Sequence, residues 1–315
     1  MVRVAIAGGT GGLGRMIAEM LEASNEHTHI ILTRKQSDLP RHVLVDYTSI
    51  ASISKTLDAH DIHTVVSVLS IKSKEQSDAQ LNLIRGAART SCVKRFTPSE
   101  FGFPRKEKRY LESTSSAADY KLAAVRELDK TGLEYTLFSH GIFADYFGMP
   151  RIKSYLDPWV FAIDIAHNMA GIPGSGDVPI VYTYSGDVAK FVLGTLSLPD
   201  RTWSRSSVMM GDRKTLNEVL RIAEAVRGTK FTVAYDPVER LKRGHITELP
   251  SHRHSYSSED SKRAFQQNFA RFGIAMESGG FDFTPSHGAL VANDAFPHIH
   301  PMSVEDVIRA GWQSP

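Results

Sequence analysis

The feature that most constrains this chain is a glycine-rich turn at residues 8–14, of sequence GGTGGLG, which follows an apolar run over residues 2–7. Apolar side chains then recur at helical spacing, at Leu13, Met16, Ile17, Met20 and Leu21. A buried strand, a glycine turn and an amphipathic helix in this order are typical of a nucleotide-binding unit. Glycines let the backbone approach a pyrophosphate, and the start of the helix offers N–H groups and a positive dipole end. We therefore predict a dinucleotide site with contacts from Gly8, Thr10, Gly11, Gly12, Leu13 and Gly14.

Basic residues follow the second predicted strand, residues 29–33, at Arg34 and Lys35. Folds that prefer NAD place an acidic residue near this point for the ribose hydroxyls, whereas a basic residue suits the 2′-phosphate of NADP. The alternative, that both are solvated loop cations, stays open. A short third strand, residues 42–47, ends in Asp46 and Tyr47, where the adenine edge would lie. We predict NADP(H) as the cofactor, bound in part by these four residues.

Strands and helices alternate through the first half of the chain. The sequence predicts further strands at residues 63–69, 93–96 and 135–139, and helices at 50–57, 79–88 and 117–130. This alternation predicts an α/β fold, a Rossmann-type doubly wound parallel sheet. Ligands bind such sheets at the carboxyl ends of the strands, so we expect cofactor contacts from Ser67, Leu69, Pro98 and Ser99.

The regularity falls away beyond Gly148, where Pro, Gly and aromatic residues become frequent. We predict a loop at residues 171–177, a strand at 179–183, and a last helix begun by Ser303 with Asp306 three residues on. The predicted organisation is an NADP-binding domain over residues 1–150 and a smaller α+β substrate-binding lobe over 151–315. A segment near residues 178–198 is expected to pack back on the first domain.

Charge and composition limit the classes of molecule that this chain is expected to bind. The net charge of +2 is too near neutral to favour nucleic acid or a membrane surface, and we expect a monomer or homodimer that binds a small molecule. Cys92 is the single cysteine, and neither a signal peptide nor a membrane span is recognisable, which favours the cytoplasm. The pairs His252-x-His254 and His298-x-His300 lack acidic or cysteine partners at metal-site spacing. We predict exposed loop histidines and no metal.

Several of these motifs together resemble the isoflavone-reductase-like, NmrA-like group of atypical short-chain dehydrogenases/reductases. They are the turn at 8–14, Arg34, the block TPSEFG at 97–102, Lys121, FADYF at 143–147, and the ending at 295–307. The resemblance implies NADPH-dependent reduction of small, often aromatic, secondary metabolites, with the lysine near the nicotinamide. The group also contains members that sense NADP or NAD without catalysis. Departures at Gly12 and Gly141, and an unmatched segment at 160–171, leave the substrate open.

Lys121 is the candidate catalytic residue. On its predicted helix it shares a face with Ala118, Ala124, Val125 and Leu128. Lysine is rarely buried without a partner or a function, and a desolvated lysine has a lowered pKa and can exchange a proton near neutrality. The alternative is a lysine whose stem covers apolar surface while its ammonium reaches water. No tyrosine precedes a lysine by four residues, so the usual Tyr-x-x-x-Lys pair of short-chain dehydrogenases is absent.

Candidate substrate contacts follow two strands. We predict pocket positions for Glu100, Phe101, His140, Phe143, Tyr146 and Met149. Plain core packing remains the alternative for the aromatic residues, and a helix cap or solvent exposure for Glu100. The sequence favours an NADPH-dependent reductase of a small organic carbonyl or activated double bond. A non-catalytic NADP sensor that binds a partner protein, and a redox-neutral enzyme on the same fold, stay open.

Overall fold

The computed structural model describes residues 1–104 and 116–313. The chain divides into two compact units. The first comprises Met1–Ser139, Val188–Met209 and Pro285–Ile299, and the second His140–Asp187, Met210–Thr284 and His300–Pro315. The predicted division after residue 150 concerns which residues bind cofactor and which bind substrate. The two compact units are defined by contacts within the chain and not by the ligands they bind, so the predicted division stays a prediction.

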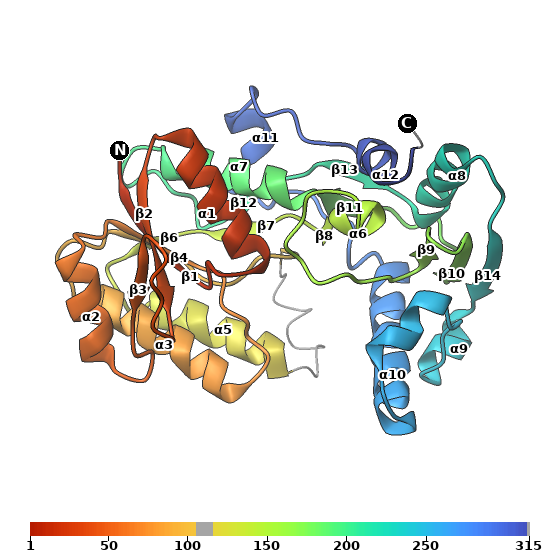
Figure 1. Cartoon of the computed structure of the whole chain (residues 1–315), viewed down its shortest axis with the longest axis horizontal. Coiled ribbons are helices and arrows are strands. Elements are labelled where there is room, and N and C mark those ends of the chain that lie inside the picture. The colour runs from red at the N-terminus through yellow and green to blue at the C-terminus, as the bar shows by residue number, and fades with distance from the viewer. Residues whose placement is uncertain (105–115, 314–315) are drawn as a thin grey trace. The chain divides into compact units, whose positions relative to one another are not determined.

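A six-stranded parallel sheet forms the centre of the first unit (Figure 1). Its strands are β1 (Arg3–Ala7), β2 (Thr28–Thr33), β3 (His42–Leu44), β4 (Thr64–Ser67), β5 (Arg95–Thr97) and β6 (Glu134–Tyr135). They lie in the order β3-β2-β1-β4-β5-β6, and every neighbouring pair is parallel. Helix α1 (Gly12–Ser24) lies on one side, and α2 (Ile50–Ala59), α3 (Lys74–Ala88) and α5 (Ser116–Leu128) on the other (Figure 1). The predicted doubly wound parallel sheet is confirmed.

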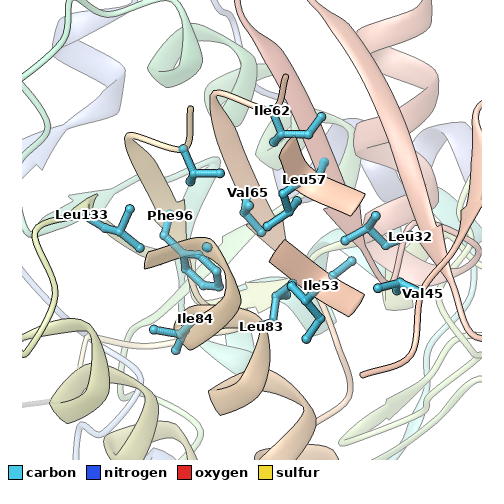
Figure 2. Packing of buried hydrophobic residues seen from close by; sticks show 14 of the residues in the cluster. Leu32, Val45, Ile53, Leu57, Ile62, Val65, Leu83, Ile84, Phe96 and Leu133 are labelled. Carbon is cyan, nitrogen blue, oxygen red and sulfur yellow. The ribbon is translucent and has the colours of Figure 1, made fainter. Parts of the chain in front are cut away.

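A hydrophobic core cluster of this unit lies between the sheet and helices α2, α3 and α5. Figure 2 shows Ile53 of α2 and Leu83 of α3 beside Val65 of β4 and Phe96 of β5, all four fully buried. Each such side chain contributes about 1.5–3 kcal/mol of transfer free energy. All four residues of β4 are buried, because helices cover both sides of the sheet. This packing holds the strands of the sheet in place, and with them the carboxyl ends of the strands.

The predicted strand at 135–139 is divided between two sheets. Its start forms β6, whereas β7 (Leu137–Ser139) pairs with β12 (Ser206–Val208) in a second sheet that also contains β15 (Leu290–Val291). At the fully buried Thr136 between them, Oγ1 lies 2.8 Å from Oγ of Ser207 and the carbonyl accepts from Oγ1 of Thr97. The prediction of one continuous strand over residues 135–139 was therefore wrong. The alternation of apolar residues does not reveal that the chain pairs with β5 first and with β12 afterwards. Helices α7 (Ser185–Leu196) and α11 (Ala292–Ala295) complete the described elements of this unit, although α7 begins in the second unit.

The second unit holds two further three-stranded sheets, in the orders β14-β10-β9 and β13-β11-β8. Its strands are β8 (Ile142–Phe143), β9 (Ile163–Asp164), β10 (Met169–Pro173), β11 (Ile180–Thr183), β13 (Asp212–Lys214) and β14 (Thr232–Asp236). Its helices are α6 (Asp145–Gly148), α8 (Leu216–Arg227), α9 (Val238–Lys242), a 3₁₀ helix (Pro250–Ser255), α10 (Glu259–Glu277) and α12 (Val304–Trp312). The predicted capping of α12 is confirmed, because Oγ of Ser303 accepts from the Asp306 N–H at 3.1 Å.

The loop predicted at residues 171–177 is partly wrong, because its first three residues belong to β10, which pairs with β14. The glycines and the proline of this segment suggested a turn, but Gly171 is glycine because of close packing in a strand. A Cβ at this position would lie 2.9 Å from Cβ of Thr247, so only glycine lets the two segments approach so closely.

Candidate cofactor site

A cleft of about 1830 Å³ lies in the first unit, at the ends of the first four strands of the chain. Residues after β1, β2, β3 and β4 line it, so it occupies the carboxyl edge of the sheet, where ligands bind in this type of fold. The predicted cofactor residues that line it are Gly8, Thr10, Gly11, Arg34, Lys35, Asp46, Tyr47 and Leu69. Arg15 and Val68 line it as well and were missed from the sequence.

Gly8 and Gly14 are needed by the protein itself. Gly8 has φ +89°, and a Cβ there would lie 2.7 Å from the carbonyl oxygen of Val68. A Cβ on Gly14 would lie 2.3 Å from the carbonyl oxygen of Gly8. Both contacts are shorter than a Cβ atom tolerates, so these glycines close the turn against β4 and against itself.

Gly11 has a different environment. It is exposed at the N-cap of α1 with φ −158°, an extended conformation that any residue adopts. A Cβ there would meet nothing within 4 Å, and the residue lines the cleft. Neither backbone conformation nor packing therefore requires glycine at this position. The free space at the start of a helix suits the phosphates of a dinucleotide, which bind helix N-termini.

Arg34 and Lys35 are both exposed on the cleft wall after β2. The turn that carries them is held by Thr33, whose Oγ1 donates to the Lys35 carbonyl at 2.9 Å. Among the described residues neither cation pairs with a carboxylate, whereas the nearby Arg41 pairs with Glu22 at 2.9 Å. Two cations without an acidic partner leave positive charge available for a phosphate.

Asp46 and Tyr47 also line the cleft, but they differ in how accessible their side chains are to a ligand. The carboxylate of Asp46 accepts from the Thr48 hydroxyl and N–H at 2.7 and 2.8 Å, and these bonds lower its pKa. Tyr47 is 6% exposed, its phenol donates to the Leu32 carbonyl at 3.4 Å, and burial raises its pKa. The Tyr47 ring therefore belongs chiefly to the core. Contact of either residue with the cofactor stays a prediction.

Ser67 and Ser99 use their hydroxyls inside the protein. Oγ of Ser67 donates to Oε1 of Gln80 at 2.9 Å, and Oγ of Ser99 donates to the Leu69 carbonyl at 2.8 Å. The N–H of Ser99 donates to the same Gln80 oxygen at 2.8 Å. Gln80 was missed, although a polar residue on the face of α3 that carries Leu83 and Ile84 was a readable signal. The two serines stay predicted cofactor contacts that do not line the cleft, as do Gly12, Leu13, Gly14 and Pro98.

Lys121 is half-buried on α5. The predicted orientation of this helix is confirmed, because Ala124 and Leu128 are fully buried while Asp119 and Arg126 are exposed. Glu100 is 4% exposed, so it does not face solvent as one alternative held. The half-buried Phe101 stacks on Phe138 with ring centroids 5.5 Å apart. The catalytic role of Lys121 and the substrate roles of Glu100 and Phe101 stay predictions.

The other predicted substrate residues lie in the second unit, and three of them, His140, Phe143 and Tyr146, belong to an aromatic cluster. The ring of the buried His140 is 4.2 Å from Phe143, and Tyr146 contacts Trp159 edge-on at 5.1 Å. Burial raises the pKa of Tyr146 to about 12, so its phenol stays protonated at neutral pH. Met149 is half-buried. Further aromatic residues of this cluster, missed from the sequence, are Trp159, Phe161, Phe265, Phe269 and Phe272.

One histidine prediction was wrong. His252 is 1% exposed rather than a surface residue, because Nδ1 accepts from the Leu249 N–H at 3.2 Å and the ring packs on Phe265. His254, His298 and His300 are exposed as predicted. Over residues 1–104 and 116–313, no group of three or more His, Cys, Asp or Glu side chains has the geometry to hold a metal ion. Within the same ranges, none of the helices combines the length and apolar character needed to cross a membrane.

Residues 2–270 match the sequence profile of the NmrA-like family. The chain belongs to this family. A relative from Botryotinia fuckeliana (strain B05.10), named Oxidoreductase BOA1, is 42% identical over 307 residues, which cover 96% of each chain. Oxidoreductase swnN of Metarhizium robertsii is 33% identical, with 99% of this chain and 98% of the relative covered. The resemblance seen in the sequence motifs is confirmed.

A solved structure shares the fold of this NmrA-like chain. Leucoanthocyanidin reductase from Vitis vinifera, in a binary complex with NADPH, superposes with a TM-score of 0.71. It is 20% identical and the match covers 97% of this chain and 98% of the other. The likeness extends through both compact units and is a likeness of fold.

Proposed function

We propose that this chain is an NADPH-dependent reductase of a small organic carbonyl or activated double bond. The observation that carries the proposal is Gly11, a glycine that neither conformation nor packing requires, facing an open cleft at a helix N-terminus. Two relatives that it matches over nearly their whole length are named oxidoreductases, and the Vitis vinifera reductase binds NADPH. These similarities support the same cofactor and reaction class here.

The residues present fit such a cofactor. The turn at 8–14 would receive the pyrophosphate through backbone N–H groups, and Arg34 and Lys35 would neutralise the 2′-phosphate. NADPH, when bound, supplies a hydride. The chain's own part is to hold the cofactor at the strand ends and to handle one proton, which we assign to the Nζ of Lys121 or to a water it orients.

The two glycines of the turn give a matched pair of variants. Gly11→Ala should fold with an unfolding free energy within about 1 kcal/mol of wild type but bind NADPH at least about tenfold more weakly, since its methyl group enters the ligand's space. Gly14→Ala should instead lower stability by about 1–3 kcal/mol, because its Cβ would overlap the Gly8 carbonyl. Calorimetric titration and thermal unfolding of both variants measure this. Unchanged NADPH affinity in Gly11→Ala would contradict the assigned phosphate site.

Cofactor preference depends on the cations after β2. Wild type should bind NADPH more tightly than NADH, and Arg34→Ala should weaken NADPH binding by about 1.5–3 kcal/mol while leaving NADH binding nearly unchanged. Arg41→Ala is the control, because Arg41 already pairs with Glu22. Titrating both cofactors into the three proteins tests the preference. Equal affinities for the two cofactors in wild type would end the NADP assignment.

Turnover separates a reductase from an NADP sensor, the second function this family admits. We expect NADPH oxidation, followed by absorbance, with at least one member of a panel of aromatic ketones, enones and aldehydes. Tight NADPH binding without turnover on any of them would favour the sensor. In that case a partner protein would be sought by pull-down with and without NADP.

A further inference from the structure

Gln80 is a polar side chain in an apolar place. It lies on the buried side of α3, is 1% exposed, and precedes the core residues Leu83 and Ile84 by three and four positions. Its Oε1 accepts two hydrogen bonds, from Oγ of Ser67 at 2.9 Å and from the N–H of Ser99 at 2.8 Å. The first donor is the last residue of β4, and the second follows β5 by two residues. One oxygen atom therefore ties together two adjacent strand ends.

These strand ends connect to the cleft. The Ser99 hydroxyl donates to the Leu69 carbonyl at 2.8 Å, and Leu69 lines the cleft. Val68, between Ser67 and Leu69, donates its N–H to the Ala7 carbonyl at 2.8 Å and packs its own carbonyl against Gly8. A continuous series of contacts thus leads from Gln80 through Ser67 and Ser99 to the cleft wall and the glycine turn.

The orientation of the Gln80 amide follows from its partners. A backbone N–H only donates, so the atom facing Ser99 is the oxygen, and Nε2 points elsewhere. Within the described residues, Nε2 is buried and has no hydrogen-bond partner. A half-satisfied buried amide is less favourable for stability than an apolar side chain of similar size. The two hydrogen bonds that Oε1 of Gln80 accepts between the strand ends offset this cost, and an apolar side chain could not accept them.

We propose that Gln80 is a positioning residue of the cofactor site. Its Oε1 holds the ends of β4 and β5 in the register that brings the 67–69 backbone to the cleft wall. Gln80 itself does not line the cleft, so it acts through these two strand ends. The inference rests on the proposed function, since it assumes that NADPH is the ligand of this cleft.

The test is NADPH affinity in variants of Gln80. Gln80→Leu keeps the volume but removes the acceptor, so the strand ends shift and the dissociation constant for NADPH should rise about tenfold. Gln80→Glu keeps an oxygen that accepts from both donors, and its affinity should return to within about threefold of wild type. If Gln80→Leu does not fold, Gln80→Asn replaces it, because it withdraws the acceptor by one methylene group.

Thr136→Val is the matched control. It removes a buried side-chain hydrogen bond of the same unit, between Thr136 and Ser207, that ties two other segments together. This variant should lose thermal stability comparably and bind NADPH like wild type. NADPH affinity within twofold of wild type in Gln80→Leu, or an equal loss of affinity in Thr136→Val, would overturn the positioning role. If wild type fails to bind NADPH, both the proposed cofactor and this inference are overturned. That result differs from the two outcomes above, which concern the variants alone.

Discussion

Lys121→Ala should fold and bind NADPH about as well as wild type while kcat falls by roughly 10²–10⁴, the range for losing a general acid or base. Lys121 is half-buried on α5, on the side of the helix that carries Ala118 and Ala124. Melting temperature should change little, because Lys121 is half-buried and is not among the residues of the hydrophobic core cluster. The measurements are kcat, the NADPH dissociation constant and the melting temperature on the same protein preparation.

Two further variants separate the roles open to Lys121. Arg126→Ala removes an exposed cation from the opposite side of the same helix and should leave kcat unchanged. Lys121→Arg keeps the positive charge on a group that does not deprotonate in proteins, so it should be as inactive as Lys121→Ala if the residue exchanges a proton. A lysine that only holds the cofactor would instead lose NADPH affinity together with rate in Lys121→Ala, and Lys121→Arg would restore part of both. Full activity in Lys121→Ala would end the catalytic assignment.

Arg95→Met should lower the free energy of unfolding by about 3–5 kcal/mol, the typical effect of breaking a buried ion pair from one side. Arg95 is 1% exposed, and its Nε donates to Oε2 of Glu134 at 2.8 Å. Its Nη1 donates to the Leu198 carbonyl at 2.9 Å, and its guanidinium lies 4.9 Å from the ring centre of Trp203. The substitution removes the cation that pairs with Glu134, whose carboxylate keeps the N–H donors of Arg201 and Trp203. It also removes the Nη1 donor of the Leu198 carbonyl. Since natural domains are stable by about 5–15 kcal/mol, the loss is a large part of the total.

Arg85→Met is the control for this variant. Arg85 pairs with Glu127 at 2.7 Å, but its side chain is 43% exposed. An exposed pair contributes about 0–1 kcal/mol, so the same chemical change should have a small effect there. Urea unfolding of wild type and both variants gives the comparison. A loss below about 1 kcal/mol in Arg95→Met would show that the network around Arg95 is not essential for stability.

The sequence determined the fold class and the glycine turn at residues 8–14 because both depend on local signals. The glycine spacing at 8–14, the apolar strands and the helical periodicity each act over a few residues, and the structure confirms the parallel sheet they predict. The capping of α12 by Ser303 and the inward side of α5 were predictable for the same reason. The family resemblance rested on short blocks of residues that need no knowledge of distant contacts.

The tertiary structure alone decided which residues meet across long distances in the sequence. The division of the strand at 135–139 depends on β12, about 70 residues later, and the strand character of residues 171–173 depends on pairing with β14. His252 is buried because of α10, and no pattern of histidines indicates this.

The cleft at the strand ends, the candidate cofactor site, also depends on contacts that the sequence does not reveal. Its glycines were recognised together from the sequence, but their separate reasons depend on contacts that each Cβ would make. Gly8 and Gly14 are required by the packing of the protein, whereas neither packing nor backbone conformation requires glycine at position 11. Gln80 joins two strand ends from a third element, and only their packing brings its oxygen between Ser67 and Ser99. Local sequence specifies elements and turns, because backbone conformation is set by near neighbours; the partners of buried polar atoms are set by the packing of elements far apart in the chain.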